Sequence, residues 1–400
     1  MSTSKLGDFL ALADSGTWGE DGTPDSGDPV LRSSNIQNGR LDLSDFAWRI
    51  IPEKYRQRGR LFPRDIIVTK SSGSANLIGK CCIFDIQAER PYYFSNFTLR
   101  LRTNHAVADY RWLYYWLTSE RGRAVLAALN TTTTGLRNLN VPRYLDQEIP
   151  SPALTDQRRY ADILDKADAI RRKRQEAITL TEQLLRSTFL EMFGDPTGET
   201  DMTTVAQLAE NKTGSIRTGP FGSQLLHSEF TDSGISVLGI DNAVENEFHR
   251  GRPRFISKEK YETLRRYTVA PHDLIITIMG TCGRCAIVPD DIPTAINTKH
   301  LCCITLDKSK CLPEFLHSYF LFHPKARSYL ERSAKGAIMD GLNMGIISQL
   351  PVPVVPLERQ RRYQGFAMPL SGLKRRLTES MNDVDTLFHS LVQRAFTGQL

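Results

Sequence analysis

The sequence lacks the features that mark membrane-spanning, secreted and fibrous proteins. Its longest apolar runs, such as residues 273–279, are far shorter than the roughly 20 residues needed to cross a bilayer. Residues 1–5 are not followed by an apolar stretch, so no secretory signal is visible. Seven cysteines, an odd number, then favour reduced thiols and a cytoplasmic location. With 40% hydrophobic and 24% charged residues, the composition is globular, which excludes collagen, a coiled-coil rod and wholesale disorder.

A strong charge of one sign is also missing. The 51 Lys and Arg residues against 45 Asp and Glu residues give a formal net charge of +6. That balance allows a polyanionic partner but falls well short of a histone-like composition. The 400 residues exceed one ordinary core and suit two or three domains of about 100–200 residues each. Composition alone therefore leaves the function open.

Motifs for catalysis and for nucleotide or metal binding are absent or incomplete. Residues 73–80 resemble a phosphate-binding loop, but five residues separate the glycines, and Cys81 stands where Ser or Thr would hold magnesium. We interpret this segment as a turn between strands. A zinc site is disfavoured because its candidate thiols lie in apolar, strand-like runs, where free cysteine is a common core residue; they are Cys282, Cys285, Cys302 and Cys303. No adenine-methyltransferase or Gly-x-Ser-x-Gly motif occurs, so we expect the chain to catalyse nothing on its own.

The sequence contains an internal repeat. Gln-Arg-Arg-Tyr occurs at 157–160 and again at 360–363, 203 residues further on. Three further matches follow the same order: 62–69 with 270–277, 79–83 with 283–287, and 171–173 with 374–376. Four matches in one order, with nearly constant offsets, indicate a tandem duplication of about 200 residues.

Each copy consists of a globular part followed by a long helix. The globular parts have short β-branched runs separated by Gly, Pro and Asn, which are typical of strands and turns. Residues 155–193 contain neither Gly nor Pro, and helix-forming residues dominate. We therefore predict two domains, 1–152 and 197–353, and two long helices, 153–196 and 354–400. In the second helix, we expect Pro369 to cause a kink or to end a short helix before a new one capped by Ser371.

Both predicted helices carry an apolar seam with alternating spacings of three and four residues. Two such seams are most simply buried against each other in an antiparallel coiled coil. The predicted fold class is therefore α+β, with two tandem α/β domains separated by two long, paired helices. The predicted seam residues are Ile163, Ile170 and Leu184 in the first helix and Leu373, Leu377, Val384 and Leu387 in the second.

This order of domain, helix, domain and helix resembles the specificity subunit of type I restriction–modification enzymes over essentially the whole chain. Local resemblances are Thr-Gly-Pro-Phe-Gly-Ser-Gln at 218–224, residues 234–242 and 271–277, and the Pro-x-Pro…Gln-Arg-Arg opening of each helix. The first copy departs from the family pattern, because residues 15–20 read Ser-Gly-Thr-Trp-Gly-Glu. The resemblance implies two target-recognition domains held apart by a coiled coil. It also implies two methylation subunits that use S-adenosylmethionine and an ATP-driven restriction subunit, with no cofactor in this chain.

The residues lead independently to a compatible prediction. Two helices of 39 residues would each span about 58 Å. If they pack antiparallel, the two domains meet a DNA duplex in opposite senses, like the half-sites of a dimer. The two domain sequences differ, so we expect an asymmetric, bipartite target with an unread spacer, and double-stranded DNA as the main partner.

Reading of bases requires hydrogen-bonding side chains on projecting turns: Arg or Lys for guanine and Asn or Gln for adenine. Each candidate residue could equally be a solvated loop residue that contacts no base. The candidates in the first copy are Arg32, Asn35, Lys70, Ser74, Lys80, Arg137 and Asn138. Those in the second copy are Ser223, Gln224, Asn242, Thr281, Arg284, Lys335 and Asn343.

Basic clusters occur at equivalent places on the two helices and include Arg171 and Arg172 in one and Lys374 and Arg375 in the other. They could contact DNA phosphates or dock the methylation subunits. Residues 155–193 carry seven acidic and eight basic residues, and this near balance favours docking. An alternative function is a coiled-coil adaptor whose domains bind proteins. A self-sufficient nuclease or methyltransferase conflicts with the missing motifs.

Overall fold

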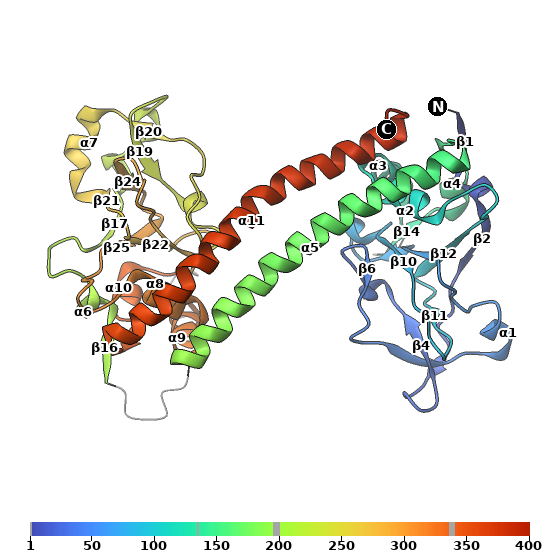
Figure 1. Cartoon of the computed structure of the whole chain (residues 1–400), viewed down its shortest axis with the longest axis horizontal. Coiled ribbons are helices and arrows are strands. Elements are labelled where there is room, and N and C mark those ends of the chain that lie inside the picture. The colour runs from blue at the N-terminus through green and yellow to red at the C-terminus, as the bar shows by residue number, and fades with distance from the viewer. Residues whose placement is uncertain (1, 134–135, 195–200, 336–340) are drawn as a thin grey trace. The chain divides into compact units, whose positions relative to one another are not determined.

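The computed structural model describes residues 2–133, 136–194, 201–335 and 341–400. The chain forms two compact units: residues 1–175 with 379–400, and residues 176–378 (Figure 1). Two long helices, α5 (Leu154–Phe193) and α11 (Leu357–Thr397), each contribute one half to each unit. The predicted α+β class with two long helices is confirmed.

Each unit is built on a four-stranded antiparallel sheet with the same strand order. In the first unit, the order is β2 (Leu10–Ser15), β12 (Thr98–Thr103), β8 (Asp65–Thr69) and β10 (Cys81–Phe84). In the second unit, it is β17 (Ile216–Thr218), β25 (Leu301–Ile304), β22 (Leu274–Thr277) and β23 (Cys285–Ile287). The strands β8 and β22 are buried throughout, as their continuous apolar runs require. The duplication therefore extends to the topology of the sheets.

A second sheet in each unit also repeats, with one parallel pair in each case, β11 with β4 and β24 with β19. In the first unit, its order is β11 (Tyr93–Phe94), β4 (Asp28–Leu31), β7 (Ala47–Ile50) and β3 (Glu20–Asp21). In the second unit, its order is β21 (Thr268–Val269), β24 (Ala295–Asn297), β19 (Ile235–Leu238), β20 (Phe255–Ile256) and β18 (Phe230–Thr231).

Shorter elements complete the two units. The strands are β1 (Thr3–Lys5) with β15 (Glu148–Pro150), β5 (Ile36–Gln37) with β6 (Arg40–Leu41), β13 (Asn130–Thr133) with β14 (Leu136–Leu139) and β9 (Ser71–Ser72), and β16 (Met202–Thr204) with β26 (Pro351–Pro353). The helices of the first unit are α1 (Glu53–Arg56), α2 (Tyr110–Thr118), α3 (Glu120–Ala128) and α4 (Val141–Leu145). Those of the second are α6 (Val205–Leu208), α7 (Lys258–Leu264), α8 (Pro313–Phe322), α9 (Pro324–Lys335) and α10 (Met344–Ser348).

The long helices belong to the cores of the units. In the first unit, Trp112 of α2 is fully buried and its ring lies 5.8 Å from that of Phe396 in α11. In the second unit, Phe189 of α5 packs against Tyr363 of α11, with ring centroids 5.3 Å apart, and against Phe315 of α8. These buried aromatic contacts attach the segments of α5 and α11 in each unit to the domain of that unit.

A buried glutamine near the start of each long helix ties the helix to the domain. In the first unit, Gln157 Oε1 accepts a hydrogen bond from the backbone N–H of Asp109 (2.9 Å), and its Nε2 donates to the carbonyl of Val107 (3.0 Å). In the second unit, Gln360 makes the same pair of bonds with the equivalent residues, 2.8 Å from the N–H of Leu312 and 3.1 Å from the carbonyl of Lys310. The repeated tetrad is thus explained, because its Gln and Tyr are buried while its arginines are exposed.

The predicted seam of the helix pair is wrong at several positions. Ile170 and Leu184 are 54% and 46% exposed, and Leu373 and Leu387 are 39% and 57% exposed. The other predicted seam residues are half-buried: Ile163, Leu377 and Val384. In α5, the buried apolar residues lie mostly one position further along the chain, among them Leu164, Ile178 and Leu185.

The register was missed because polar residues occupy part of the true seam. Asp168 is buried, and its carboxylate pairs with Arg171 (2.9 Å), whose guanidinium also lies 5.0 Å from the ring of Phe388 in α11. Arg174 donates to the carbonyl of Ser380 in α11 (3.1 Å). A pattern that counts only apolar residues cannot include these contacts.

Helix α11 runs without a break through Pro369, so the predicted new helix capped by Ser371 is wrong. Proline removes one backbone hydrogen bond, that to the carbonyl four residues earlier. Gly365, which carries this carbonyl, is exposed, as is Pro369 itself. Water can therefore satisfy the carbonyl at this point. The kink stays a prediction.

We expect Gln157→Leu and Gln360→Leu each to lower the free energy of unfolding by about 2–4 kcal/mol, because each leaves a buried N–H and carbonyl without partners. Chemical denaturation measures the change. The matched control is Gln393→Leu, an exposed glutamine of α11, which should have little effect. Equal losses in all three variants would contradict the role assigned to the buried amides.

Candidate nucleic-acid interface

In the second unit, three turns leave the same edge of the central sheet. They are residues 219–224 after β17, 278–284 between β22 and β23, and 298–300 before β25; we call them the second turn edge. Strand pairing brings them together, since Thr218 lies opposite Cys302 and Thr277 lies opposite Leu301. Four predicted DNA-reading residues lie on this edge, namely Ser223, Gln224, Thr281 and Arg284.

The first unit presents the equivalent edge. Its turns are residues 16–19 after β2, 70–80 between β8 and β10, and 95–97 before β12, which together form the first turn edge. The middle turn contains β9, which pairs with β14 and so places Arg137 opposite Ser72. Five predicted residues are thereby brought together: Lys70, Ser74, Lys80, Arg137 and Asn138.

On the first turn edge, some candidates are anchored and others project. Lys70 Nζ donates to Ser15 Oγ (2.9 Å), and burial lowers the pKa of this lysine below its usual value. Asn138 Oδ1 accepts a hydrogen bond from Ser71 Oγ (2.6 Å). Ser74 and Arg137 are exposed. Exposed side chains on an anchored turn are suited to contact a polar ligand.

On the second turn edge, the middle turn is closed by a hydrogen bond between the residues at its two ends. Thr277 Oγ1 accepts a hydrogen bond from the N–H of Arg284 (2.9 Å), while the side chains of Arg284 and Thr281 are exposed. The N–H of Ile278 donates to the carbonyl of His300 (2.9 Å), which joins this turn to the next. Burial, with a smaller effect of Lys299, lowers the pKa of His300, so its ring is neutral at pH 7.

Two predicted base-reading asparagines have structural roles, and the prediction is wrong for both. Asn35 ends a 3-10 turn, η2 (Ser33–Asn35), and is 3% exposed. Its Oδ1 accepts from the N–H of Arg32 (2.8 Å), and its Nδ2 donates to the carbonyls of Asp42 and Asp45. These bonds hold the amide in the interior, so it cannot reach a base.

Asn242 has the same role in the second unit. It ends η6 (Ile240–Asn242) and is 2% exposed. Its Oδ1 accepts from the N–H of Gly239 (2.7 Å), and its Nδ2 donates to the carbonyl of His249 (2.7 Å). Asparagine suits this position because its short side-chain amide can form hydrogen bonds with nearby backbone groups in a tight turn.

The remaining candidates are placed as follows. The guanidinium of Arg32 pairs with Asp45. Asn343 is exposed but caps α10, since its Oδ1 accepts from the N–H of Ile346 (2.9 Å). Lys335 is the last residue of α9, and its side chain lies outside the described residues. Gln224 is exposed, but its Oε1 is occupied by the N–H of Phe221 (3.1 Å).

Three of the four named basic residues on the helices are ion-paired within their own units: Arg171, Arg172 and Lys374. Lys374, with its side chain 12% exposed, lies 2.5 Å from Glu182 and 2.8 Å from Glu247. Burial alone would lower the pKa of Lys374, but hydrogen bonds to these carboxylates outweigh it and raise the pKa. In the first unit, Arg171 and Arg172 both pair with Asp168. Arg375 is exposed and remains available.

Large exposed apolar residues also lie on both turn edges, and the search for hydrogen-bonding side chains missed them. They are Leu77 and Phe97 on the first edge and Phe221 and Met279 on the second. A large apolar residue within a predicted turn, flanked by glycines and polar residues, is the sequence pattern that would have indicated these four positions.

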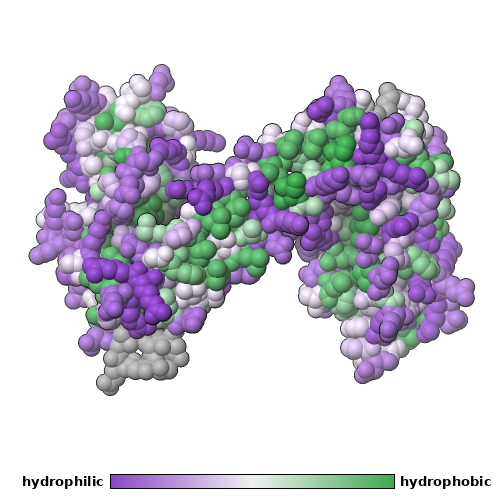
Figure 2. Space-filling view, in the orientation of Figure 1, coloured by the Kyte–Doolittle hydropathy of each residue, from purple (hydrophilic) through white to green (hydrophobic). Residues whose placement is uncertain are grey.

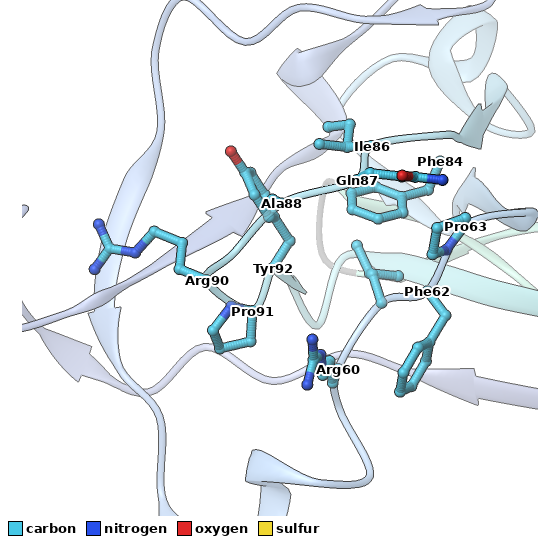
Figure 3. A pocket seen from close by; sticks show the side chains of 11 residues that line it. Arg60, Phe62, Pro63, Phe84, Ile86, Gln87, Ala88, Arg90, Pro91 and Tyr92 are labelled. Atoms are coloured by element: carbon cyan, nitrogen blue, oxygen red, sulfur yellow. The ribbon is translucent and has the colours of Figure 1, made fainter.

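The first unit contains a cavity of about 180 Å³ at the opposite end of β8 and β10 from the first turn edge. Figure 3 shows Phe62, Pro63, Phe84 and Tyr92 around it. The guanidinium of Arg60 at its margin lies over the ring of Phe62, 5.2 Å from the centroid. Its lining is largely apolar, and its place excludes it from the candidate interface.

Within the described ranges, no three His, Cys, Asp or Glu side chains are grouped to hold a metal ion. The candidate zinc thiols Cys285, Cys302 and Cys303 are fully buried in strands, and burial raises the pKa of Cys302 to about 12. A neutral, buried thiol is an inert packing group. Among the same residues, no helix combines the length and apolarity that crossing a membrane requires.

Comparison with known proteins identifies the family. The model of the type I restriction modification DNA specificity domain matches residues 1–180 and 223–366. The chain belongs to this family of specificity subunits. The resemblance predicted from the sequence is thereby confirmed.

Individual relatives of this specificity subunit are distant but extend over most of its length. It is 22% identical to the StySPI specificity subunit of Salmonella potsdam over 390 residues, covering 93% of this chain and 82% of the relative. It is also 22% identical over 400 residues to the EcoKI specificity subunit of Escherichia coli K12, with the same coverage. The crystal structure of an S subunit from M. genitalium superposes with a TM-score of 0.64 at 13% identity, covering 99% of this chain and 96% of that one. The two proteins share a fold.

We expect Asn35→Ala and Asn242→Ala to destabilise the specificity subunit by about 1–3 kcal/mol each, because both leave buried backbone groups unsatisfied. The free energy of unfolding in urea measures this loss. Asn211→Ala, at an exposed asparagine, is the control and should change little. If the two buried asparagines were as replaceable as Asn211, their structural role would be wrong.

Proposed function

We propose that this specificity subunit is the non-catalytic DNA reader of a type I restriction–modification complex and recognises an asymmetric bipartite target, one half-site per domain. The observation that carries the proposal is the repeated turn edge. The two edges project from sheets of identical strand order but differ in side chains: Ser74 and Arg137 are exposed on the first, and Thr281 and Arg284 on the second. One scaffold with two sets of side chains supports two different half-sites.

The exposed arginines are the strongest candidates for base contacts. A guanidinium can donate two parallel hydrogen bonds to O6 and N7 of guanine in the major groove. Arg137 and Arg284 form no ion pair among the described residues, unlike Arg171, Arg172 and Lys374, which are neutralised by carboxylates. Arg137 and Arg284 are therefore cationic donors that no carboxylate of the described residues neutralises.

We also infer that methylation subunits dock on the long helices. Four apolar residues of the helices in the second unit are exposed: Leu180, Leu184, Met368 and Leu373. In the first unit, Ile170 and Leu387 are exposed in the same way. Figure 2 shows hydrophobic side chains gathered over the helices. Contiguous apolar surface between charged residues is typical of a protein interface.

The chemistry then belongs to the partners. The methylation subunits supply S-adenosylmethionine and modify adenine, which must leave the base stack to reach a catalytic pocket. An ATP-driven restriction subunit joins the same complex. This chain contributes the register on the DNA and the choice of target.

Replacing residues 1–150 by the equivalent segment of another family member should change one half of the methylated target and leave the other half unchanged. Each half-site is read by side chains of one unit, so the change cannot spread. Methylome sequencing of cells that express the hybrid with its methylation subunit measures the outcome. A change in both halves would contradict the assignment of one half-site to each domain.

Leu184→Asp should weaken the complex with the methylation subunit about 10-fold or more, because it places a charge in an apolar interface. The neighbouring variant Gln183→Asp is the control, since it adds the same charge at an exposed polar position of α5. Analytical ultracentrifugation measures the dissociation. Unchanged assembly by Leu184→Asp would place the docking surface elsewhere.

A further inference from the structure

One turn is duplicated at the two turn edges. It reads Gly16-Thr-Trp-Gly19 in the first unit and Gly219-Pro-Phe-Gly222 in the second, 203 residues apart. Each follows the edge strand of the central sheet, β2 or β17. The third position is aromatic in both, Trp18 and Phe221.

The same two constraints fix both turns. The first glycine packs against a neighbouring backbone so closely that a Cβ atom would lie 1.9 Å from the carbonyl oxygen of Phe94 at Gly16 and 2.0 Å from that of Asn297 at Gly219. The second glycine has a positive φ, 64° at Gly19 and 54° at Gly222, where side chains other than glycine are strained. The first copy, which departs from the family's sequence pattern, therefore keeps the same turn as the second copy.

The two aromatic rings differ in what covers them. Trp18 is half-buried; the guanidinium of Arg49 lies 4.1 Å from its ring centroid, and its ring packs against a cluster that includes Val30 and Tyr93. Phe221 is 54% exposed, and no ring or cation of the described residues contacts it. The second unit therefore presents to solvent the ring that the first unit covers itself.

The backbone under Phe221 is firmly held. Its N–H donates to Gln224 Oε1 (3.1 Å), and its carbonyl accepts from the N–H of Gln224 (3.1 Å). The same Oε1 accepts from the hydroxyl of Tyr267 (2.9 Å), which connects the turn to the rest of the unit. A phenyl ring on a fixed backbone has only two free torsions, so little conformational entropy is lost when a ligand covers it.

The surroundings of Phe221 indicate the kind of ligand. Ser223 is exposed two residues away, and Arg284 and Lys299 lie on adjoining turns of the same edge. Cationic and hydroxyl groups on the same edge as an exposed ring suit a nucleic acid better than an apolar protein surface, because they match phosphates and base edges.

We propose that Phe221 is a DNA-contacting residue that makes an apolar contact with a base in the half-site read by the second unit. Its phenyl ring packs either on the C5-methyl group of a thymine or on the face of an unstacked base, the two apolar surfaces that DNA offers. The inference rests on the proposed function as a DNA reader. It also assigns Gln224, an expected base reader, to holding Phe221 in place.

The test uses the complex with the methylation subunit and a duplex carrying the target found by methylome sequencing. Phe221→Ala should weaken binding about 10-fold or more and reduce discrimination only in the second half-site. Phe221→Leu should retain part of the affinity. The slope of affinity against salt should not change, because no charge is removed.

Two modified duplexes separate the two base surfaces. Deoxyuridine in place of thymine should weaken wild-type binding but not that of Phe221→Ala, if the ring contacts the methyl group. An increase in 2-aminopurine fluorescence on wild-type binding, absent with Phe221→Ala, would show an unstacked base. Either result supports the proposal.

The control is Met202→Ala, which removes another exposed apolar side chain of the second unit, in β16 and away from the turn edge. It should bind the duplex as the wild type does. If Phe221→Ala also binds normally while Arg284→Ala does not, the proposal for Phe221 is wrong and the DNA-reading function stands. If the wild-type complex prefers no duplex sequence, both are wrong.

Discussion

The buried amide at the root of each long helix, Gln157 or Gln360, fixes how that helix leaves its domain. Apolar packing holds two elements together but is non-directional, whereas hydrogen bonds from one amide to two backbone groups specify distance and angle. In both units, these groups lie just before the helix that follows the central sheet, α2 or α8. The position of each turn edge relative to its half of the helix pair therefore depends on one side chain that cannot turn without leaving buried groups unpaired.

The two copies agree most closely at residues that fix the backbone geometry of turns. Equivalent glycines pack against carbonyl oxygens at residues 16 and 219, and equivalent asparagines close 3-10 turns at residues 35 and 242. Buried ion pairs are repeated less closely between the two copies. Asp65 and Asp273 are both buried at the start of the same strand, but the partner is Arg102 from β12 in the first unit and Arg217 from β17 in the second. What both copies require is a neutralised carboxylate, and the source of the cation has changed.

The repeat, the fold class and the two long helices could be predicted because they depend on local pattern: periodicity, Gly and Pro placement and a duplicated tetrad. The seam register could not, because the polar side chains of the helices are covered by virtue of their partners: Asp168 pairs with Arg171, and Lys374 pairs with Glu182 and Glu247, which are both distant from it in sequence. The two buried asparagines were misjudged for a related reason. An amide that can read adenine can equally close a tight turn, and only the surroundings of the side chain decide between the two roles.

Trp18 and Phe221 occupy equivalent positions in the two units. Two residues at one structural position have the same backbone constraints, so a difference in their burial reports a difference in what covers the side chain. Arg49 covers Trp18 within the first unit, and this cation–π contact stabilises the ring without a ligand. On the bipartite target that we propose, the first unit would read its half-site with other side chains, such as Arg137, whereas the second unit retains an exposed ring beside Ser223. Two units with one scaffold but different exposed side chains on their edges fit the asymmetric target that we propose.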